Sequence, residues 1–475
     1  MKEKSTRQNS IDFTEGSIIK KLLVFIGPLI LTGVLQILYT AADNIIVGQF
    51  SGDHLAIAAI GQTGTITAMF INCLIAFTGG ASIMLSQYVG ARRYDDIRRS
   101  IKTAFPLSLL LGVLVSAVAL SLVRIMVENI VNPELHSRAI TYVAIVVLGI
   151  PALSVYNMGA AILRAKGNSK LPLYIGAASG VLNVLLNVVF VAGCGMSVEG
   201  VAIATVISQY ASAVAILVAF TRMRDEAYRL KLGEMRLDGS YVIRMLSLGV
   251  PQAISTLVTY VALLVSTYTL NKYFNPVMLS AASVASTVDS IVFVLMSSVT
   301  TAVITIIGQN YGRGKYDRIK KSIFISLATS VTITVLVSLL IYLVGPAVGS
   351  LFISDTNPDK AEIIRLASEN WFTYLTSTYF LFAIMSTLTG VVRGLGFVKS
   401  AMVADFIGNS GAKVVWMLFI FPIYSESMKW CLTGHAVTWV LNSILFAILI
   451  IIALRFVKRR IASEDMIAGS VGDDI

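Results

Sequence analysis

One carboxylate stands out because it lies inside a long apolar segment. Asp43 falls near the end of the apolar run that covers residues 20–45. An acid is costly to keep charged at membrane depth, so it is a functional candidate unless a partner or a water-filled cavity explains it. Burial favours the protonated acid, whereas a bound cation or a hydrogen-bond donor favours the carboxylate. Asp43 is therefore predicted to bind and release a small cation, either a proton or Na+.

Three further polar residues within apolar segments supply oxygen atoms. Asn183 and Asn187 are one helical turn apart in the segment 171–193, so their side chains face the same way. Thr205 lies in the next segment, 199–221. Amide and hydroxyl oxygens can help to ligate a hard cation. Each residue is equally suited to an interhelical hydrogen bond in a membrane, and the sequence leaves both interpretations open.

A second group of charges occupies the other half of the chain. Asp289 lies in the apolar segment 278–308, and Asp405 and Lys413 lie in the segment 399–421. Opposite charges inside a membrane usually pair, so we expect Lys413 to neutralise Asp289. The alternative is that this pair opens during the working cycle.

Proline interrupts two of the apolar segments. Pro28 precedes Asp43 in the same segment, and Pro251 lies at a similar place in the segment 241–270. Proline removes a backbone donor and clashes with the preceding turn, so each helix can bend or hinge there. Bending at Pro28 would move Asp43. A fixed kink, satisfied by neighbouring helices, is the alternative interpretation.

The elements that hold these residues are predicted to be membrane-spanning helices. The 475 residues are 56% hydrophobic and only 13% charged, whereas soluble domains contain about 25% charged residues. Each long apolar stretch can cross about 30 Å of hydrocarbon with its backbone hydrogen bonds satisfied. We expect an all-α polytopic membrane protein with twelve spans, at 20–45, 55–86, 101–123, 139–163, 171–193, 199–221, 241–270, 278–308, 322–344, 366–392, 399–421 and 431–455.

The basic residues predict the orientation of these spans, because Lys and Arg are retained in short cytoplasmic loops. One side of the membrane receives only Arg124, Arg138, Lys272, Lys360, Arg365 and Lys429, and Lys413 lies within a span. All other basic residues fall on the side of the two termini. We therefore expect a multi-pass protein of the cell membrane with both termini in the cytoplasm. The predicted order is a tail, a six-helix lobe, a linker that tethers the lobes, a second six-helix lobe and a tail, at 1–15, 16–221, 222–240, 241–457 and 458–475.

Composition and motifs argue against other classes of protein. The net charge is +11, but nucleic-acid binding needs basic residues gathered on one solvated face, and here they are spread over short loops. Cys73, Cys194 and Cys431 show no metal-type spacing and are expected to be small core residues. No catalytic motif or Cys/His cluster appears, so we expect neither an enzyme nor a cofactor. The polar segments before about Asp12 and after about Ala462 are expected to be disordered tails.

The two halves of the chain repeat each other. The sequence SQYVGARRYDDIRRSI at 86–101 aligns with GQNYGRGKYDRIKKSI at 308–323. Further landmarks recur in the same order, namely Pro28 with Pro251, Arg164 with Arg393, Gly167 with Gly396 and Gly200 with Gly434. Because each half has six spans, the two halves share one topology. They are expected to be pseudo-symmetric about an axis along the membrane normal, with the substrate bound in a central cleft.

From about Gly16 to Arg455 the sequence resembles the MATE (multidrug and toxic compound extrusion) family. The resemblance is carried by the paired loops and by GPLILTGVLQILYTAADNIIVG at 27–48, LRAKGNSKLPLY at 163–174 and GVAIATVISQY at 200–210. It implies two six-helix lobes around a cleft that opens alternately to either side. It also implies export of organic, mostly cationic and amphiphilic compounds in exchange for protons or sodium.

The resemblance assigns ion coupling in the first lobe to Asp43, with Asn183, Asn187 and Thr205 around it. Tyr39, one turn before Asp43, is a secondary candidate. Many members carry a second acid where this chain has Asn187, so Asp43 is expected to be the main titrating group. A sodium ion would be held at Asp43 and Asn183.

In the second lobe the resemblance is weaker. The sodium-linked branch of the family places acids near Thr259 and Phe382, which cannot replace them. Asp289 and Lys413 remain as secondary candidates there.

The substrate side is inferred from the class of compound. Aromatic and methionine side chains suit amphiphilic cations through dispersion and cation–π contacts. The candidates for the cleft are Met69, Tyr156, Met158, Phe293, Met296 and Tyr379. For each of them taken singly, a core or lipid-facing position is the favoured alternative. The expected partners are organic cations and membrane lipid, and the expected state is a monomer. The alternative is a flippase for a lipid-linked or polyanionic substrate, which should line its cleft with several buried Arg or Lys.

Overall fold

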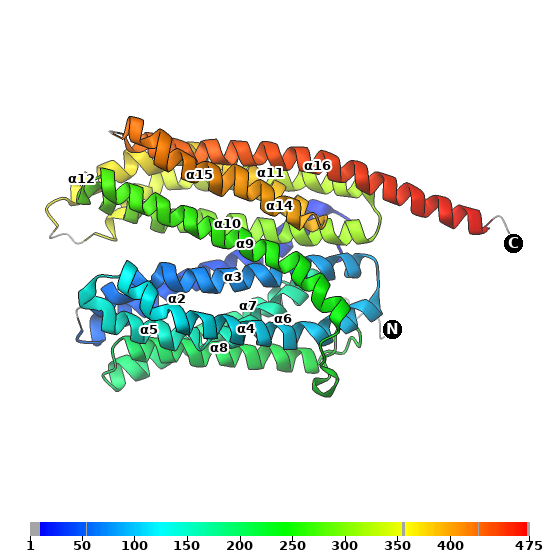
Figure 1. Cartoon of the computed structure of the whole chain (residues 1–475), viewed down its shortest axis with the longest axis horizontal. Coiled ribbons are helices and arrows are strands. Elements are labelled where there is room, and N and C mark those ends of the chain that lie inside the picture. Colours follow the sequence, from blue (N-terminus) through cyan, green and yellow to red (C-terminus); the bar gives the residue numbers. More distant parts are fainter. Residues whose placement is uncertain (1–9, 54, 354–356, 426, 473–475) are drawn as a thin grey trace. The chain divides into compact units, whose positions relative to one another are not determined.

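The computed structural model describes residues 10–53, 55–353, 357–425 and 427–472, and every regular element among them is helical (Figure 1). Eleven of the described helical segments are long and apolar enough to span a membrane. Pro133–Val147 and Ile150–Lys166, bent by 45°, form a twelfth span if they are taken together. The predicted all-α polytopic architecture is confirmed. Residues 1–9 and 473–475 of the predicted tails lie outside the described residues.

The first half contains α2 (Ile18–Phe50), α3 (Ala56–Gly90), α4 (Tyr94–Ile130), α5 (His136–Val147), α6 (Ile150–Lys166), α7 (Lys170–Asn187) with the π-helix η3 (Val188–Gly193), and α8 (Val198–Thr221). In this bundle α6 packs against α3, α4 and α8, and α7 packs against α8. The apolar stretch of α3 is 56% buried, compared with 22% for α2. Helices α3 and α6 therefore form the centre of the bundle.

The second half contains α9 (Gly239–Tyr273), α10 (Pro276–Gly312), α11 (Tyr316–Ser350), the span α12–η5–η6–α13 (Lys360–Ala367, Ser368–Leu375, Thr376–Thr378, Tyr379–Gly394), the span α14–η7–α15–η8–η9 (Val398–Ala404, Asp405–Gly411, Ala412–Val415, Trp416–Ile420, Phe421–Tyr424) and α16 (Met428–Gly472). Helix α13 packs against α10, α11 and α16. Helix α16 continues through Gly472 and extends beyond the other helices of its unit (Figure 1). The disordered C-terminal tail predicted after Ala462 is therefore wrong as far as Gly472, because no proline interrupts the helix there.

The internal repeat is visible in the backbone of the paired loops. Arg92 has φ 57° and its counterpart Gly314 has φ 71°, so both loops turn through a left-handed residue at the same place. The amide of Arg93 donates to the carbonyl of Tyr88 over 3.0 Å, and the amide of Lys315 donates to that of Asn310 over 3.0 Å. Arg92 adopts in the first loop a conformation that glycine reaches without steric cost in the second.

The ends of α6 and α13 repeat each other as well. Gly167 has φ 92° and Gly396 has φ 90°. Their amides close the same kind of turn by donating to the carbonyls of Arg164 and Arg393, over 2.9 and 2.8 Å. A left-handed glycine is the usual way to end a helix and satisfy its last carbonyls.

The helices form two compact units whose limits differ from the predicted lobes. Unit 1 consists of Met1–Phe13 and Leu23–Thr256, and unit 2 consists of Thr14–Leu22 and Leu257–Ile475. The division within the second half thus falls inside α9, after Thr256, and not in the linker predicted at 222–240. Each half contributes a short segment to the unit formed by the other half.

The predicted linker is part of unit 1. Tyr228 and Leu230 are buried in the core of that unit. Lys166 lies over the ring of Tyr228, 3.8 Å from its centroid, and forms a 2.8 Å ion pair with Asp225. Burial raises the pKa of the Tyr228 hydroxyl above its usual range. The segment is therefore a packed element, not a tether, because it carries apolar side chains that unit 1 buries.

The charges of the linker also bind it to unit 1. Glu234 forms ion pairs with Lys102, Arg98 and Lys231. The hydrogen bonds from Lys102 and Lys231 lower the pKa of the Glu234 carboxyl to about 2. Lys102 and Arg98 lie near the start of α4, so these contacts attach the linker to that helix.

Candidate functional site in unit 1

Four predicted ion-coupling residues form one continuous hydrogen-bonded row. Asn187 donates from Nδ2 to Oδ1 of Asp43 over 2.5 Å and lies 3.4 Å from Oδ1 of Asn183. Asn183 donates from its own Nδ2 to the hydroxyl of Thr205 over 3.3 Å. The row joins α2, α7 and α8, and the sequence reasoning placed all four residues together correctly.

The asparagines of this row are deeply buried, and Asp43 is half-buried. Asn187 is fully buried and Asn183 is 6% exposed. The Oδ1 atom of Asn187 has no hydrogen-bond partner among the described residues. A buried acceptor without a donor is costly unless something else occupies it. The site therefore offers an unused oxygen beside the carboxylate of Asp43.

Local backbone geometry sets the position of Asn187. It is the last residue of α7, and the π-helix η3 begins at Val188. A π-helical turn has one more residue than an α-helical turn and is often found at functional sites. Because the change begins directly after Asn187, the side chain lies where the hydrogen-bond ladder of the helix is rearranged.

An apolar cluster lies next to the row, towards the C-terminal end of α2. Its buried members are Ile46, Val47, Ala56, Val191, Val198 and Val201, with Tyr142 and Val184 packed against them. These residues come from α2, α3, η3 and α8, with Tyr142 from α5 and Val184 from α7. The cluster packs these elements together around the C-terminal end of α2.

Among the described residues no hydrogen bond joins Tyr39, the secondary candidate, to Asp43. Its hydroxyl donates to the carbonyl of Ala177 over 3.1 Å and so links α2 to α7. Pro28 lies inside α2, and its carbonyl accepts a 2.8 Å hydrogen bond from the hydroxyl of Thr32. Pro251 lies inside α9. Both prolines are thus within continuous helices, as the hinge prediction requires.

The pairing predicted for the second half is not found. Asp289 accepts a hydrogen bond from the hydroxyl of Tyr379. The ammonium of Lys413 lies 3.5 Å from Nδ1 of His435, in reach of that acceptor. Among the described residues no ion pair joins Asp289 to Lys413, so that interpretation is corrected. The reason is that each charge is held by a neutral polar side chain of an adjacent helix.

Asp405, the other acid predicted within a span of the second half, does have a cationic side-chain partner. Its Oδ2 accepts from Arg393 over 2.9 Å, and its Oδ1 accepts from Asn442 over 3.1 Å. Asp405 is 7% exposed. The sequence showed Arg393 only as a basic loop residue, and its position at the end of α13 is what brings it to Asp405.

The structure places some of the residues expected to line a cleft in the core and leaves others partly or largely exposed. Met158 is fully buried and Met296 is 1% exposed, with its sulfur 3.3 Å from the donor hydroxyl of Thr334. Their burial makes these two core residues. Tyr156 is also buried and donates to the carbonyl of Pro172 over 2.9 Å. Met69 is partly buried against a core cluster, whereas Phe293 is 65% exposed and Tyr379 contacts Asp289.

One polar cluster was missed by the sequence reasoning. Asp53, between α2 and α3, accepts from Arg138 over 2.6 Å and from Ser197 over 3.0 Å. These hydrogen bonds, with that from Arg138 dominant, hold the pKa of the Asp53 carboxyl below its usual value. Arg138 was counted only as a topology signal. Few basic residues are predicted on the same side of the membrane as Arg138. This scarcity was the only sequence feature that indicated a specific partner for it.

Comparison with known proteins decides the family. The model of the MatE family matches this chain twice, over residues 28–189 and 251–418. The chain belongs to the MatE family. The two MatE matches begin at Pro28 and Pro251, which agrees with the repeat. MatE proteins are transporters and not enzymes, so this chain is a multi-pass membrane protein of a transporter family.

Several MatE relatives are similar along most of their length. A probable multidrug resistance protein NorM of Thermotoga maritima is 24% identical, over 89% of this chain and 88% of its own. The probable multidrug resistance protein YpnP of Bacillus subtilis is 27% identical, over 83% and 87%. The multidrug and toxin extrusion protein 1 of Mus musculus is 24% identical, over 82% of this chain and 67% of its own.

Solved MatE structures share the fold. A crystal structure of MATE in complex with MaL6 has a TM-score of 0.83 at 19% identity and covers 95% of this chain and 98% of its own. An outward-facing multidrug resistance MATE family transporter has a TM-score of 0.80 at 20% identity, with coverage of 96% and 98%. At such low identity the likeness concerns the fold alone.

Proposed function

We propose that this MatE protein is a secondary active multidrug efflux antiporter. It exports organic, mostly cationic and amphiphilic compounds in exchange for protons or sodium ions, with Asp43 as the coupling group. The names of the relatives, which are multidrug resistance and extrusion proteins, support the export of several drugs. The observation that carries the coupling is the row Asp43–Asn187–Asn183–Thr205 inside the first unit.

The chemistry of this row suits an exchange of cations. A protonated Asp43 has no charge, so it cannot balance a cationic compound, and a deprotonated Asp43 can. The oxygens of Asn183, Asn187 and Thr205 can instead complete the coordination of a sodium ion beside the carboxylate. In both cases the coupling ion and the exported cation compete for one charge. Competition for a single charge is the simplest basis for antiport.

The direction of transport depends on orientation. The bias of basic residues supports both termini in the cytoplasm. The end of α2 that follows Asp43 then faces the exterior. Asp43 lies closer to that end than to the cytoplasmic end of α2, so an ion that enters from outside has the shorter path to the acid. Bending of α2 at Pro28 would move Asp43 between two environments as the cycle proceeds.

The test is transport by purified protein in liposomes. Uptake of a fluorescent organic cation is recorded with proton and sodium gradients imposed separately, for the wild type and Asp43→Asn. We expect one gradient to drive wild-type uptake, and Asp43→Asn to lose this response by at least about tenfold, because the amide can neither titrate nor balance a cation. Asp95→Asn, the same change at an exposed position of α4, is the matched control and should transport normally.

Two outcomes would contradict the proposal. A full response of Asp43→Asn to the gradient would remove Asp43 from coupling. If neither gradient drives wild-type uptake of several organic cations, multidrug antiport fails. A flippase for a lipid-linked or polyanionic substrate then becomes the better hypothesis, to be tested with the same vesicles.

A further inference from the structure

Arg164 is a cation that the proposed transport chemistry does not use. It lies in the last turn of α6, within unit 1. Its Nε atom is buried and has no hydrogen-bond acceptor among the described residues. The residue as a whole is only partly buried, so a ligand can reach the end of the guanidinium group.

No acidic side chain neutralises Arg164 in the part of the chain that the structure describes. The titratable group that acts on it electrostatically is the hydroxyl of Tyr156, which is neutral at pH 7. This hydroxyl already donates to the carbonyl of Pro172 over 2.9 Å. The next basic residue, Lys166, has its own acid, Asp225, at 2.8 Å. The positive charge of Arg164 is therefore not balanced by the described residues of unit 1.

The second repeat contains the same arginine together with an acid. Arg393 takes the position of Arg164 at the end of α13, and its guanidinium group forms a 2.9 Å ion pair with Asp405. Asn442 donates to the other oxygen of this carboxylate over 3.1 Å. The carbonyl groups at the end of a helix attract a cation in both repeats. Because Arg393 has a carboxylate in addition to its helix end, we expect Arg164 to need an anion as well.

Unit 1 lacks the acid because the two repeats differ at this point. By the alignment of the repeats, Gly176 stands at the position of Asp405, and Ser208 stands at the position of Asn442. A Cβ atom at Gly176 would lie 2.9 Å from the hydroxyl oxygen of Tyr156. The tyrosine therefore takes up space beside the position where the other unit has its carboxylate.

Contacts between helices support this alignment. In unit 1 the hydroxyl of Ser179 donates to the carbonyl of Ser208 over 2.6 Å. In unit 2 the aligned residues are Gly408 and Asn442, and a Cβ atom at Gly408 would come within 2.9 Å of the Cα atom of Asn442. The same two positions thus meet in both units.

The surroundings of Arg164 suit a phosphate group. A guanidinium group presents paired N–H donors that match the oxygens of a phosphate. The end of α6 is predicted to face the cytoplasm, where lipid phosphates and free phosphate are both available. The apolar stretch of the next span, Lys170–Gly193, is only 22% buried, so the acyl chain of a lipid can lie along it.

We propose that unit 1 binds a phosphate group at Arg164. The bound phosphate takes the part that Asp405 has beside Arg393 in the other repeat. This inference goes beyond the export function and does not depend on it. A ligand that binds only the native state raises its stability, so binding should raise the melting temperature.

The test measures the melting temperature of the full-length protein in a nonionic detergent at increasing probe concentration. The probes are dioctanoyl phosphatidylglycerol and inorganic phosphate. Dioctanoylglycerol, which lacks the phosphate, and sodium chloride at equal ionic strength are their controls. We expect the wild type to be stabilised by at least one phosphate probe beyond its control. Arg164→Gln should weaken this binding at least about tenfold, since a hydrogen bond to a charged group contributes this much.

Matched variants control for charge and for folding. Arg229→Gln makes the same change at an exposed position of unit 1 and should bind the probe normally. Arg164→Lys keeps the charge but loses the paired donors, so it should bind more strongly than Arg164→Gln and more weakly than the wild type.

A second variant supplies the missing acid and does not remove the arginine. Gly176→Asp introduces the carboxylate, and Tyr156→Phe in the same chain removes the hydroxyl that the new side chain would meet. We expect this double variant to melt above Tyr156→Phe alone when no probe is present. It should bind the phosphate probe at least about tenfold more weakly than Tyr156→Phe, because the internal carboxylate competes for Arg164. This comparison remains decisive if Arg164→Gln does not fold.

The two probes distinguish the source of the phosphate. A response that depends on Arg164 and is limited to phosphatidylglycerol supports a lipid headgroup, and one that includes inorganic phosphate supports a site for free phosphate. Equal binding by the wild type, Arg164→Gln and the double variant would overturn the proposal, as would a wild type that neither probe stabilises beyond its control. No ion gradient or transported compound is present, so either failure leaves the proposed antiport unaffected.

Discussion

At the scale of single residues, Asn187 is the member of the row that contacts both Asp43 and Asn183. Its amide group donates to Asp43 and lies near Asn183, and its oxygen has no partner among the described residues. The sequence predicted this neighbourhood because helical spacing puts Asn183 and Asn187 on one face. It did not predict which atoms would meet, because amide orientation depends on the donors and acceptors of other helices.

Replacement of Asn187 by leucine tests the row. The change keeps the branched shape and the number of side-chain heavy atoms but removes both amide contacts, so the half-buried Asp43 carboxylate loses its donor. We expect Asn187→Leu to reduce gradient-driven uptake at least about tenfold, because the lost hydrogen bond to a charged group is worth about 1.5–3 kcal/mol. The liposome assay measures this. Asn129→Leu, at an exposed position of α4, should transport normally, and an equal loss there would make the effect non-specific.

Asp53 gives a prediction about pH. Its hydrogen bond from Arg138 lowers the pKa of the carboxyl, and burial opposes this only partly. The native state therefore binds the proton more weakly than the unfolded chain. The stabilisation is present above the unfolded pKa of about 4 and is lost as the pH falls through the folded pKa.

The measurement for Asp53 is the melting temperature in detergent at several pH values. We expect Asp53→Asn to melt below the wild type at pH 7, with a destabilisation of about 1 kcal/mol. The difference should shrink as the pH falls below about 4, because the wild-type carboxyl is then protonated as well. A difference that does not depend on pH would show that the charge of Asp53 is not what stabilises the loop.

At the scale of elements, apolar length predicted the spans and the repeat predicted their grouping. The helical interruptions were not predicted. Neither η3 nor η7 has a sequence signature, because one additional residue in a turn is set by packing around the helix. The bend between α5 and α6 was missed for the same reason, since the apolar pattern continues across it.

Pro28 is the element-scale test of motion. Pro28→Ala supplies the missing backbone donor and allows a straight, more rigid α2. We expect a lower rate of organic-cation uptake, with the melting temperature maintained or raised. Pro106→Ala, in the middle of α4, is the matched control. Equal slowing by both changes would indicate a general effect of helix rigidity and not a hinge at Pro28.

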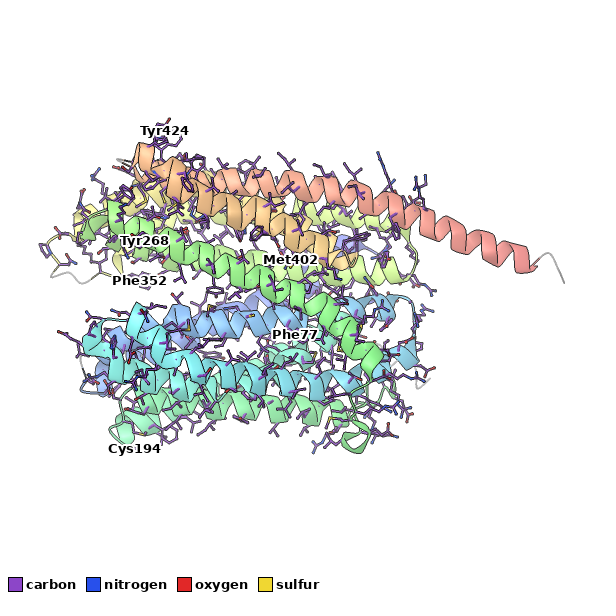
Figure 2. All side chains as sticks on the ribbon, viewed as in Figure 1. Phe77, Cys194, Tyr268, Phe352, Met402 and Tyr424 are labelled. Carbon is purple, nitrogen blue, oxygen red and sulfur yellow. The ribbon has the colours of Figure 1, made fainter. Side chains whose placement is uncertain are left out.

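At the scale of the whole molecule, orientation can be tested with a native cysteine. Cys194 is exposed in the connection between η3 and α8, and Figure 2 shows it at one end of the helices of unit 1. If the termini are cytoplasmic, this connection faces outside. A membrane-impermeant maleimide should then label Cys194 in intact cells, and Cys194→Ser should abolish the signal.

The matching control lies on the other side. The control variant carries Cys194→Ser together with Glu226→Cys, at an exposed position of the segment 222–240. The new cysteine should be labelled only after the cells are opened. If Glu226→Cys were labelled in intact cells and Cys194 were not, the topology would be the reverse of the predicted one. The direction of export would then have to be reversed as well.

The limits of the two units carry a consequence for dividing the chain. Residues 14–22 of the first repeat belong to unit 2, and residues 239–256 of the second repeat belong to unit 1. Such a reciprocal exchange of segments is also the arrangement of a domain-swapped dimer. A chain cut within residues 222–240 would therefore give two fragments, each of which carries a segment that belongs to the unit formed mainly by the other.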